Sequence, residues 1–300
     1  MNEIGAPVSD VTALLALGER LYGDHPNRKA PSYLREYARL LHHRREEPLR
    51  ILELGIATGA SLLLWHEYLP KAIIVGVDIL PAPESVIGKD RIICLRGSQD
   101  DPGTLDRAAA LAGGPFDLIV DDASHIGYLT KRAFAYLFPR WLLPGGHYVI
   151  EDFGTGMMVE YPDGEAFVEP PWDDARPGTR RFESHRSGMV GVVKQLIDHM
   201  MTELIAGRPA AFAIARVTIL TNIAFVEKDP SASVGPPPPP AEPDPQAVAR
   251  LTSSDLPTLA DAIRQQDARL AAAEAQLGRL LQILRPVLRL ARWLRLPRAG

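Results

Sequence analysis

The chain has 300 residues, of which 46% are hydrophobic, and its formal net charge is −4. This length and apolar content suffice for one α/β domain with a full core and some appendages. The balance of charge excludes a wholly basic nucleic-acid-binding protein, so we expect no nucleic acid as a partner. The single cysteine, Cys94, excludes an intrachain disulfide, and its apolar surroundings in the sequence favour a buried structural thiol.

The N-terminal part of the chain predicts two helices. Ser9 and Ser32 each precede a helical pattern of apolar residues and are expected to cap these helices. We therefore interpret residues 1–48 as a helical cap. The first ten residues lack the basic and apolar regions of a secretion signal, and no apolar stretch approaches ~20 residues. These features favour a cytoplasmic protein.

From residue 49 onward, short apolar strands alternate with helices. This alternation predicts a sheet covered by helices on both faces. We expect an α/β domain over residues 49–228 with a mainly parallel seven-stranded sheet. Strands are predicted at 50–54, 72–78, 91–95, 116–121, 146–151, 212–216 and 219–226, and helices at 60–68, 104–112, 129–138 and 189–206.

Residues 153–188 interrupt the alternation with a long segment that is rich in proline and glycine. A long irregular segment in a compact domain is typical of a substrate lid or binding loop. Tyr161 and Trp172 lie in it, and these aromatic rings are expected either to pack within the lid or to stack on a sugar ring.

The C-terminal part has two further segments. Residues 229–249 form a linker with five consecutive prolines, a composition that favours a stiff, extended spacer. In residues 250–300, apolar residues recur every seven positions from Leu256 to Leu284, which predicts a coiled-coil helix. We expect this tail to make a homo-oligomer or to bind a partner helix. Its arginines also suit contact with an anionic membrane surface at the inner face, and an exposed helix folded onto its own domain is a third alternative.

Carboxylates directly follow two of the predicted strands. Asp121 and Asp122 end one strand, with His125 shortly after, and Glu151 and Asp152 end the next strand in the chain. Open α/β sheets bind ligands beyond the carboxyl ends of their strands, so these side chains are expected at one edge. Carboxylate oxygens suit a hard divalent cation, and a nearby histidine suits proton abstraction. The pattern predicts a metal-assisted transfer enzyme.

A tight turn is predicted between the first strand and its helix. Gly55 and Gly59 let the backbone approach a ligand, and Asp78 at the end of the second strand can accept hydrogen bonds from ribose hydroxyls. The glycine spacing departs from the dinucleotide-binding fingerprint, and Glu53 before the turn suits a cationic or zwitterionic cofactor better than a diphosphate. Two residues after the third strand are expected to contact an adenine: Ser98 and Gln99.

These motifs support a resemblance. Residues 49–155 resemble class I S-adenosylmethionine-dependent methyltransferases, which implies a Rossmann-like methyltransferase fold. The motifs Val120-Asp-Asp-Ala-Ser-His125 and Val149-Ile-Glu-Asp152 are similar to those of metal-dependent sugar O-methyltransferases from macrolide and tetracenomycin pathways, to which cephalosporin-hydroxylase-like proteins are related. The similarity extends more loosely to residue 228 and does not cover the linker or the tail. Ala57 stands where many methyltransferases have glycine.

The resemblance implies two cofactors, S-adenosylmethionine and a divalent cation, with Mg²⁺ as the first expectation and Mn²⁺ as the second. It implies that Asp122, Glu151 and Asp152 are metal ligands, that His125 is the general base, and that Asp121 lies near the cofactor. A cation that chelates two adjacent hydroxyls stabilises the developing alkoxide. The implied substrate is a sugar hydroxyl on a glycosylated small molecule or glycan.

The residues also allow several alternatives. The acceptor can instead be another diol or a catechol, and the methyl transfer can be metal-free. The carboxylates can form only a solvated acidic rim, and an iron oxygenase site would need His147 or His185 to join His125. A catalytically degenerate scaffold that acts through its tail is an interpretation from a different functional class.

Overall fold

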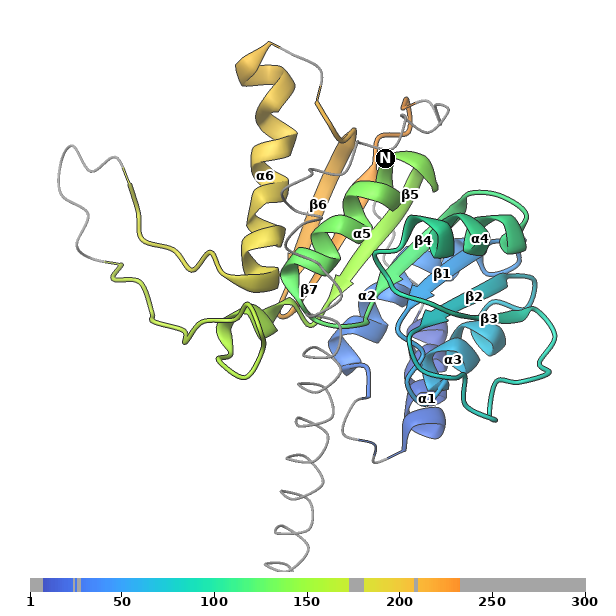
Figure 1. Cartoon of the computed structure of the whole chain (residues 1–300). Coiled ribbons are helices and arrows are strands. Elements are labelled where there is room, and N and C mark those ends of the chain that lie inside the picture. The colour runs from blue at the N-terminus through green and yellow to red at the C-terminus, as the bar shows by residue number, and fades with distance from the viewer. Residues whose placement is uncertain (1–7, 24, 26–27, 173–180, 208–209, 233–300) are drawn as a thin grey trace, which may run out of the picture. The chain divides into compact units, whose positions relative to one another are not determined.

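The computed structural model describes residues 8–23, 25, 28–172, 181–207 and 210–232 (Figure 1). The chain divides into two compact units, Met1–Pro238 and Pro239–Gly300, and all described residues lie in the first. The predicted coiled coil and basic tail lie outside the described residues and stay predictions. In the part of the chain that is described, no helix combines the length and apolar character needed to cross a membrane.

The first unit is built on a seven-stranded sheet in the order β3-β2-β1-β4-β5-β7-β6. The pairs among β1 to β5 are parallel, and β7 pairs antiparallel with both β5 and β6. The predicted mainly parallel sheet is therefore confirmed. The chain order reverses between β1 and β4, and ligands bind at such a reversal in open α/β sheets. The strand bounds are β1 Arg50–Leu54, β2 Ile73–Asp78, β3 Ile92–Arg96, β4 Phe116–Asp121, β5 Leu142–Glu151, β6 Ile214–Leu220 and β7 Ile223–Lys228.

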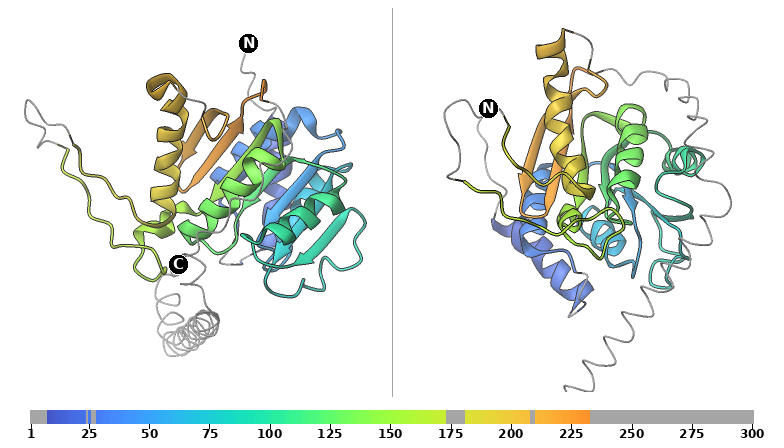
Figure 2. Two further views of the ribbon diagram at one scale, coloured as in Figure 1. Left: turned by 45° about the horizontal axis from the view of Figure 1, so that its top comes forward. Right: turned by 60° about the vertical axis from the view of Figure 1, so that its left-hand side comes forward.

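Helices cover both faces of the sheet (Figure 2). One face packs against α1 (Val8–Tyr22), α2 (Pro31–Leu41) and α3 (Ala60–Tyr68). The other face packs against α4 (Pro102–Ala112), α5 (Gly127–Arg140) and α6 (Gly188–Ala206). Successive residues of a strand point to opposite faces, so Ile51 joins the first core cluster and Leu52 joins the second. The near-continuous apolar strands follow from burial on both sides.

The two N-terminal helices each start one residue before the predicted cap, so both capping predictions are wrong. Ser9 lies inside α1, which begins at Val8. The N-cap of α2 is Ala30, no side chain caps this helix, and Pro31 takes the first helical position. Proline suits that position because its φ is already helical and its missing N–H would have no partner there.

Two short 3₁₀ helices complete the secondary structure of the described residues, η1 (His42–Arg44) and η2 (Phe153–Met157). After η2, the described parts of the predicted lid contain no helix or strand until α6 begins at Gly188. Its two aromatic candidates differ in position. Trp172 is 96% exposed, whereas the ring of Tyr161 lies edge-on to His125 with centroids 6.3 Å apart. Only Tyr161 is thus near the predicted catalytic residue.

Candidate active site

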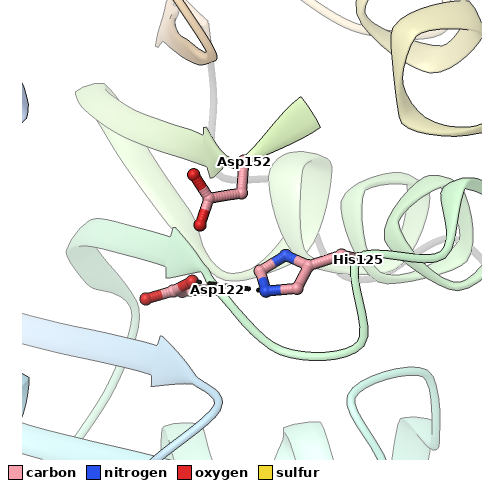
Figure 3. A group of neighbouring side chains, drawn as sticks. All are labelled: Asp122, His125 and Asp152. Carbon is pink, nitrogen blue, oxygen red and sulfur yellow. Dashed lines mark ion pairs between the residues drawn. The ribbon is translucent and has the colours of Figure 1, made fainter. Parts of the chain in front are cut away.

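Three of the predicted site residues converge at the carboxyl ends of β4 and β5. Asp122, His125 and Asp152 each offer one ligand atom, and these atoms all lie within 4.8 Å of one another. Figure 3 shows their side chains pointing toward a common space. His125 Nε2 is 3.8 Å from Asp122 Oδ1, and all three residues are partly exposed. The arrangement offers two carboxylates to a cation with an imidazole beside them.

The backbone turns sharply at two of these residues. His125 has a φ of 54° and Asp152 a φ of 52°, both in the left-handed region. Histidine and aspartate enter that region more readily than most residues, but each such turn still costs of the order of 1–2 kcal/mol. Such strain is common where a site holds its side chains in a fixed arrangement.

A buried lysine lies beneath this group. Lys29 Nζ is 2.8 Å from Glu151 Oε1, 3.0 Å from Asp122 Oδ2 and 3.4 Å from Glu53 Oε1. Tyr37 donates a hydrogen bond of 2.5 Å to Glu151 Oε1. Burial lowers the pKa of Lys29, but the carboxylates of Asp122, Glu151 and Glu53 outweigh it, so the net pKa lies well above its ordinary value. Glu151, a predicted metal ligand, is therefore held by Lys29 and Tyr37 in a buried layer.

Asp152 is held by two other residues. Tyr33 Oη lies 2.8 Å from Asp152 Oδ1, and Asn222 Nδ2 donates to the same oxygen at 2.8 Å. Asn222 also accepts a hydrogen bond from the backbone N–H of Gly154 at 2.6 Å, which ties the β6–β7 turn to the segment after β5. Burial, together with the hydrogen bond to Asp152, raises the pKa of Tyr33, so its hydroxyl remains a proton donor.

Sequence reasoning missed four of the residues that support the carboxylates: Lys29, Tyr33, Tyr37 and Asn222. One signal was present in the sequence. Tyr33 and Tyr37 are four residues apart, so they lie on one side of α2, and Lys29 stands four residues before Tyr33, just ahead of the helix. Two tyrosines on the buried face of a helix need hydrogen-bond partners for their hydroxyls, and carboxylates are suitable acceptors.

The glycine turn after β1 lies next to the segment that carries Asp122. Gly55 and Gly59 have φ values of 95° and 80°, and a Cβ on Gly55 would lie 2.1 Å from the carbonyl oxygen of Asp122. Asp78 Oδ2 accepts hydrogen bonds from the backbone N–H groups of Ile56 and Ala57 at 2.8 and 3.2 Å. The structure thus brings three predicted cofactor residues, Gly55, Gly59 and Asp78, to one turn.

The other predicted cofactor residues have partners within the protein. Glu53 is buried and accepts a 2.6 Å hydrogen bond from Trp65 Nε1. Asp121 accepts hydrogen bonds from Gln99 Nε2 at 3.1 Å and from Tyr148 Oη at 2.8 Å. Burial raises the pKa of Asp121 to about 6. Gln99 also links this buried cluster to the segment before His125, because its Oε1 accepts a hydrogen bond from the backbone N–H of Ser124. Ser98 Oγ donates a hydrogen bond to Asp100.

The sheet order, the glycine turn after β1, Asp78 after β2 and the carboxylates after β4 and β5 together define a Rossmann-like methyltransferase fold. No family model matches the chain. It is 38% identical over 211 residues to the 8-demethyl-8-(2-methoxy-alpha-L-rhamnosyl)-tetracenomycin-C 3'-O-methyltransferase of Streptomyces olivaceus. It is 33% identical over 214 residues to the demethylmacrocin O-methyltransferase of Streptomyces fradiae.

These two matches cover 66% and 67% of this chain but only 48% and 49% of the relatives, so the chain spans about half the length of the curated relatives it matches. A solved structure of MycE methyltransferase from the mycinamycin biosynthetic pathway, in complex with Mg, SAH and mycinamycin VI, matches with a TM-score of 0.60 and 29% identity. That match covers 80% of this chain and 59% of the other. The resemblance to sugar O-methyltransferases is confirmed.

Proposed function

We propose that the protein transfers a methyl group from S-adenosylmethionine to a hydroxyl of a sugar on a glycosylated small molecule, with a divalent cation in the site. The observation that carries this proposal is the convergence of Asp122, His125 and Asp152 beside the glycine turn. The relatives support it, because they are methyltransferases of glycosylated tetracenomycin and macrolide compounds, and MycE was solved with Mg and SAH.

The donor set fits a hard cation. Asp122 and Asp152 each offer carboxylate oxygen, and Mg²⁺ is commonly held by one or two carboxylates while it keeps its remaining positions for water and substrate. In this proposal Asp122 and Asp152 hold the cation, and Glu151 supports the site from the buried layer. Imidazole nitrogen is a poorer ligand for Mg²⁺ than oxygen is, which leaves His125 for proton transfer.

The chain's own residues then have distinct roles. When bound, the cation supplies Lewis-acid stabilisation of the developing alkoxide, and the sulfonium supplies a reactive methyl group. His125 Nε2 faces Asp122 and takes the proton of the attacking hydroxyl. The resulting imidazolium is stabilised by the carboxylate of Asp122, 3.8 Å away. The turn at Gly55 and Gly59 positions the methyl donor, so that attacker and methyl group are aligned.

The test combines binding with turnover. Calorimetry measures S-adenosylmethionine affinity, and methyl transfer to a panel of rhamnosides is measured with and without EDTA. We expect EDTA to stop the reaction. We expect His125→Ala to lower turnover by about 10²-fold or more, with the affinity for S-adenosylmethionine nearly unchanged. The matched control is His43→Ala, because His43 is an exposed histidine near the amino end of β4, whereas the candidate site lies at the carboxyl end.

Three results would contradict the proposal in different ways. Methyl transfer that resists EDTA would indicate a metal-free enzyme. A catalytically normal His125→Ala variant would remove the base. Failure to bind S-adenosylmethionine at all would favour a scaffold that has lost its activity.

A further inference from the structure

The fully buried Lys29 has no part in the chemistry proposed above, yet its ammonium lies at the centre of the site's carboxylates. Its side chain is only 2% exposed, and Glu53, Asp122 and Glu151 all lie within 3.4 Å. Burying a lysine is expensive unless its charge is matched, so few lysines are fully buried. The carboxylates come from the ends of three neighbouring strands, β1, β4 and β5.

Asp122 belongs to two groups at once. Its Oδ2 lies 3.0 Å from Lys29 Nζ, whereas its Oδ1 is the oxygen that lies 3.8 Å from His125 Nε2. The two oxygens of one carboxylate therefore have separate partners, one buried and one at the partly exposed group. Because Asp122 itself is partly exposed, its side chain would be free to rotate toward water without the contact to Lys29.

We infer that Lys29 is a positioning residue: its ammonium binds one oxygen of Asp122 so that the other oxygen faces the candidate metal group with Asp152. This inference rests on the proposed function, because it gives the cation to Asp122 and Asp152. Lys29 is itself held in place, since it lies just before the Ala30 cap of α2 and since Tyr37 on that helix binds the same carboxylate, Glu151.

The direction in which the affinity for a divalent cation changes distinguishes a positioning role of Lys29 from a purely electrostatic one. Lys29→Met removes a positive charge, and Coulomb's law alone predicts tighter binding of a divalent cation to the more negative site. Loss of positioning predicts the reverse. Residues that orient metal ligands typically change metal affinity by 10–100-fold when they are mutated, so we expect Mn²⁺ to bind about 10–100-fold more weakly.

The experiment measures Mn²⁺ affinity by electron paramagnetic resonance, with the free energy of unfolding measured separately by urea. The control is Lys228→Met, because Lys228 is also a buried lysine but donates to the carbonyls of Pro139 and Leu142, away from the carboxylates. This control is expected to lower stability and to leave Mn²⁺ affinity within about threefold of the wild type.

A second comparison controls for misfolding of the Lys29→Met variant. Lys29→Met leaves Glu151 buried without its cation, so Glu151→Gln is combined with it to restore the balance of charge. Comparing this double variant with Glu151→Gln alone isolates the effect of Lys29 on Asp122, and we expect the same loss of about 10-fold or more. Weaker Mn²⁺ binding in every Lys29 variant that folds supports the inference.

Unchanged or tighter Mn²⁺ binding in folded Lys29 variants would overturn the role of Lys29 and leave the proposed function intact. If the wild-type protein itself binds no Mn²⁺ or Mg²⁺, the metal-assisted function and the role of Lys29 both fall. The two failures are therefore distinguishable from the wild-type titration alone.

Discussion

In the candidate site, the glycine turn lies very close to the backbone of the segment that carries Asp122. Gly55→Ala tests whether this close packing is needed for stability and turnover. A Cβ on Gly55 would lie 2.1 Å from the carbonyl oxygen of Asp122 and 2.9 Å from Cα of Ala123. Real Cβ atoms essentially never come within 3.0 Å of another heavy atom, so one of the two segments must move by about 1 Å. The atoms in the way are backbone atoms, which cannot rotate aside as a side chain does.

Two terms contribute to the expected loss of stability. Gly55 has a φ of 95°, and a residue with a side chain at positive φ costs about 1–2 kcal/mol. Forcing extra volume into a packed site costs about 1–3 kcal/mol more. We therefore expect Gly55→Ala to lower the free energy of unfolding by about 2–5 kcal/mol. A catalytic group displaced by about 1 Å also loses about 10²-fold in turnover.

The assay compares Gly55→Ala with a matched control, Gly113→Ala. Gly113 has a φ of 79° at the end of α4, with nothing within 4 Å of its added Cβ, so it carries the backbone strain without the clash. Urea unfolding is expected to show a loss of about 1–2 kcal/mol for the control, with normal Mn²⁺ affinity and normal turnover. A Gly55→Ala variant that loses no more stability than Gly113→Ala and keeps wild-type Mn²⁺ affinity would show that the two segments are not closely packed.

Two further predictions concern the cofactor turn and the buried acid. Ala57 is exposed and has a φ of 45°, so Ala57→Gly relieves backbone strain but makes the unfolded chain more flexible. Urea unfolding should show that the free energy of unfolding rises by about 0.5–1 kcal/mol. A decrease would mean that Ala57 is not strained. Burial raises the pKa of Asp121 to about 6, above its value in the unfolded chain, so its contribution to stability is present below pH ~4 and is lost as the pH rises through about 6. Relative to Asp121→Asn, the wild type should lose about 2 kcal/mol between pH 4 and pH 7 in urea unfolding, and a constant difference across that range would contradict the shifted pKa.

Much of the fold follows from local pattern. The bounds of β1, α3 and β4 match the predicted ranges 50–54, 60–68 and 116–121, because buried parallel strands are short apolar runs between turn residues. Element starts were less predictable. β5 begins at Leu142 instead of residue 146, because Leu142 pairs with Phe116 of β4 while Pro144 and Gly145 on their own resemble a turn.

The candidate site was predictable only where its residues are adjacent in the chain. Asp122, His125 and Asp152 come from two short motifs, and the sheet order brings those motifs together. The sequence motif did not show that the side chains of Glu151 and Asp152 point in different directions. Glu151 is the last residue of β5, and strand alternation turns its side chain to the face covered by α2, whereas Asp152 lies beyond the strand in a left-handed turn.

The supporting residues could not be found from motifs because their partners are distant. Lys29 lies 122 residues from Glu151, and Tyr33 lies 119 residues from Asp152. Nothing near Lys29 in the sequence specifies a carboxylate partner, and a lone lysine before a helix is usually solvated. Tertiary packing of α2 against one face of the sheet makes these contacts, so the segment predicted as an N-terminal cap forms part of the site.

The charges of the site favour cationic ligands. Four carboxylates lie at the sheet edge, those of Glu53, Asp122, Glu151 and Asp152, and Lys29 is the cation placed among them in the part of the chain that the structure describes. When all four are ionised, three negative charges remain, and burying such charges without compensation is unfavourable. A divalent cation and a cofactor with one net positive charge would together neutralise the edge. Lys29 offsets one of the two charges of the inner pair, Glu53 and Glu151, so two of the three remaining charges fall on Asp122 and Asp152, the two carboxylates that lie beside His125.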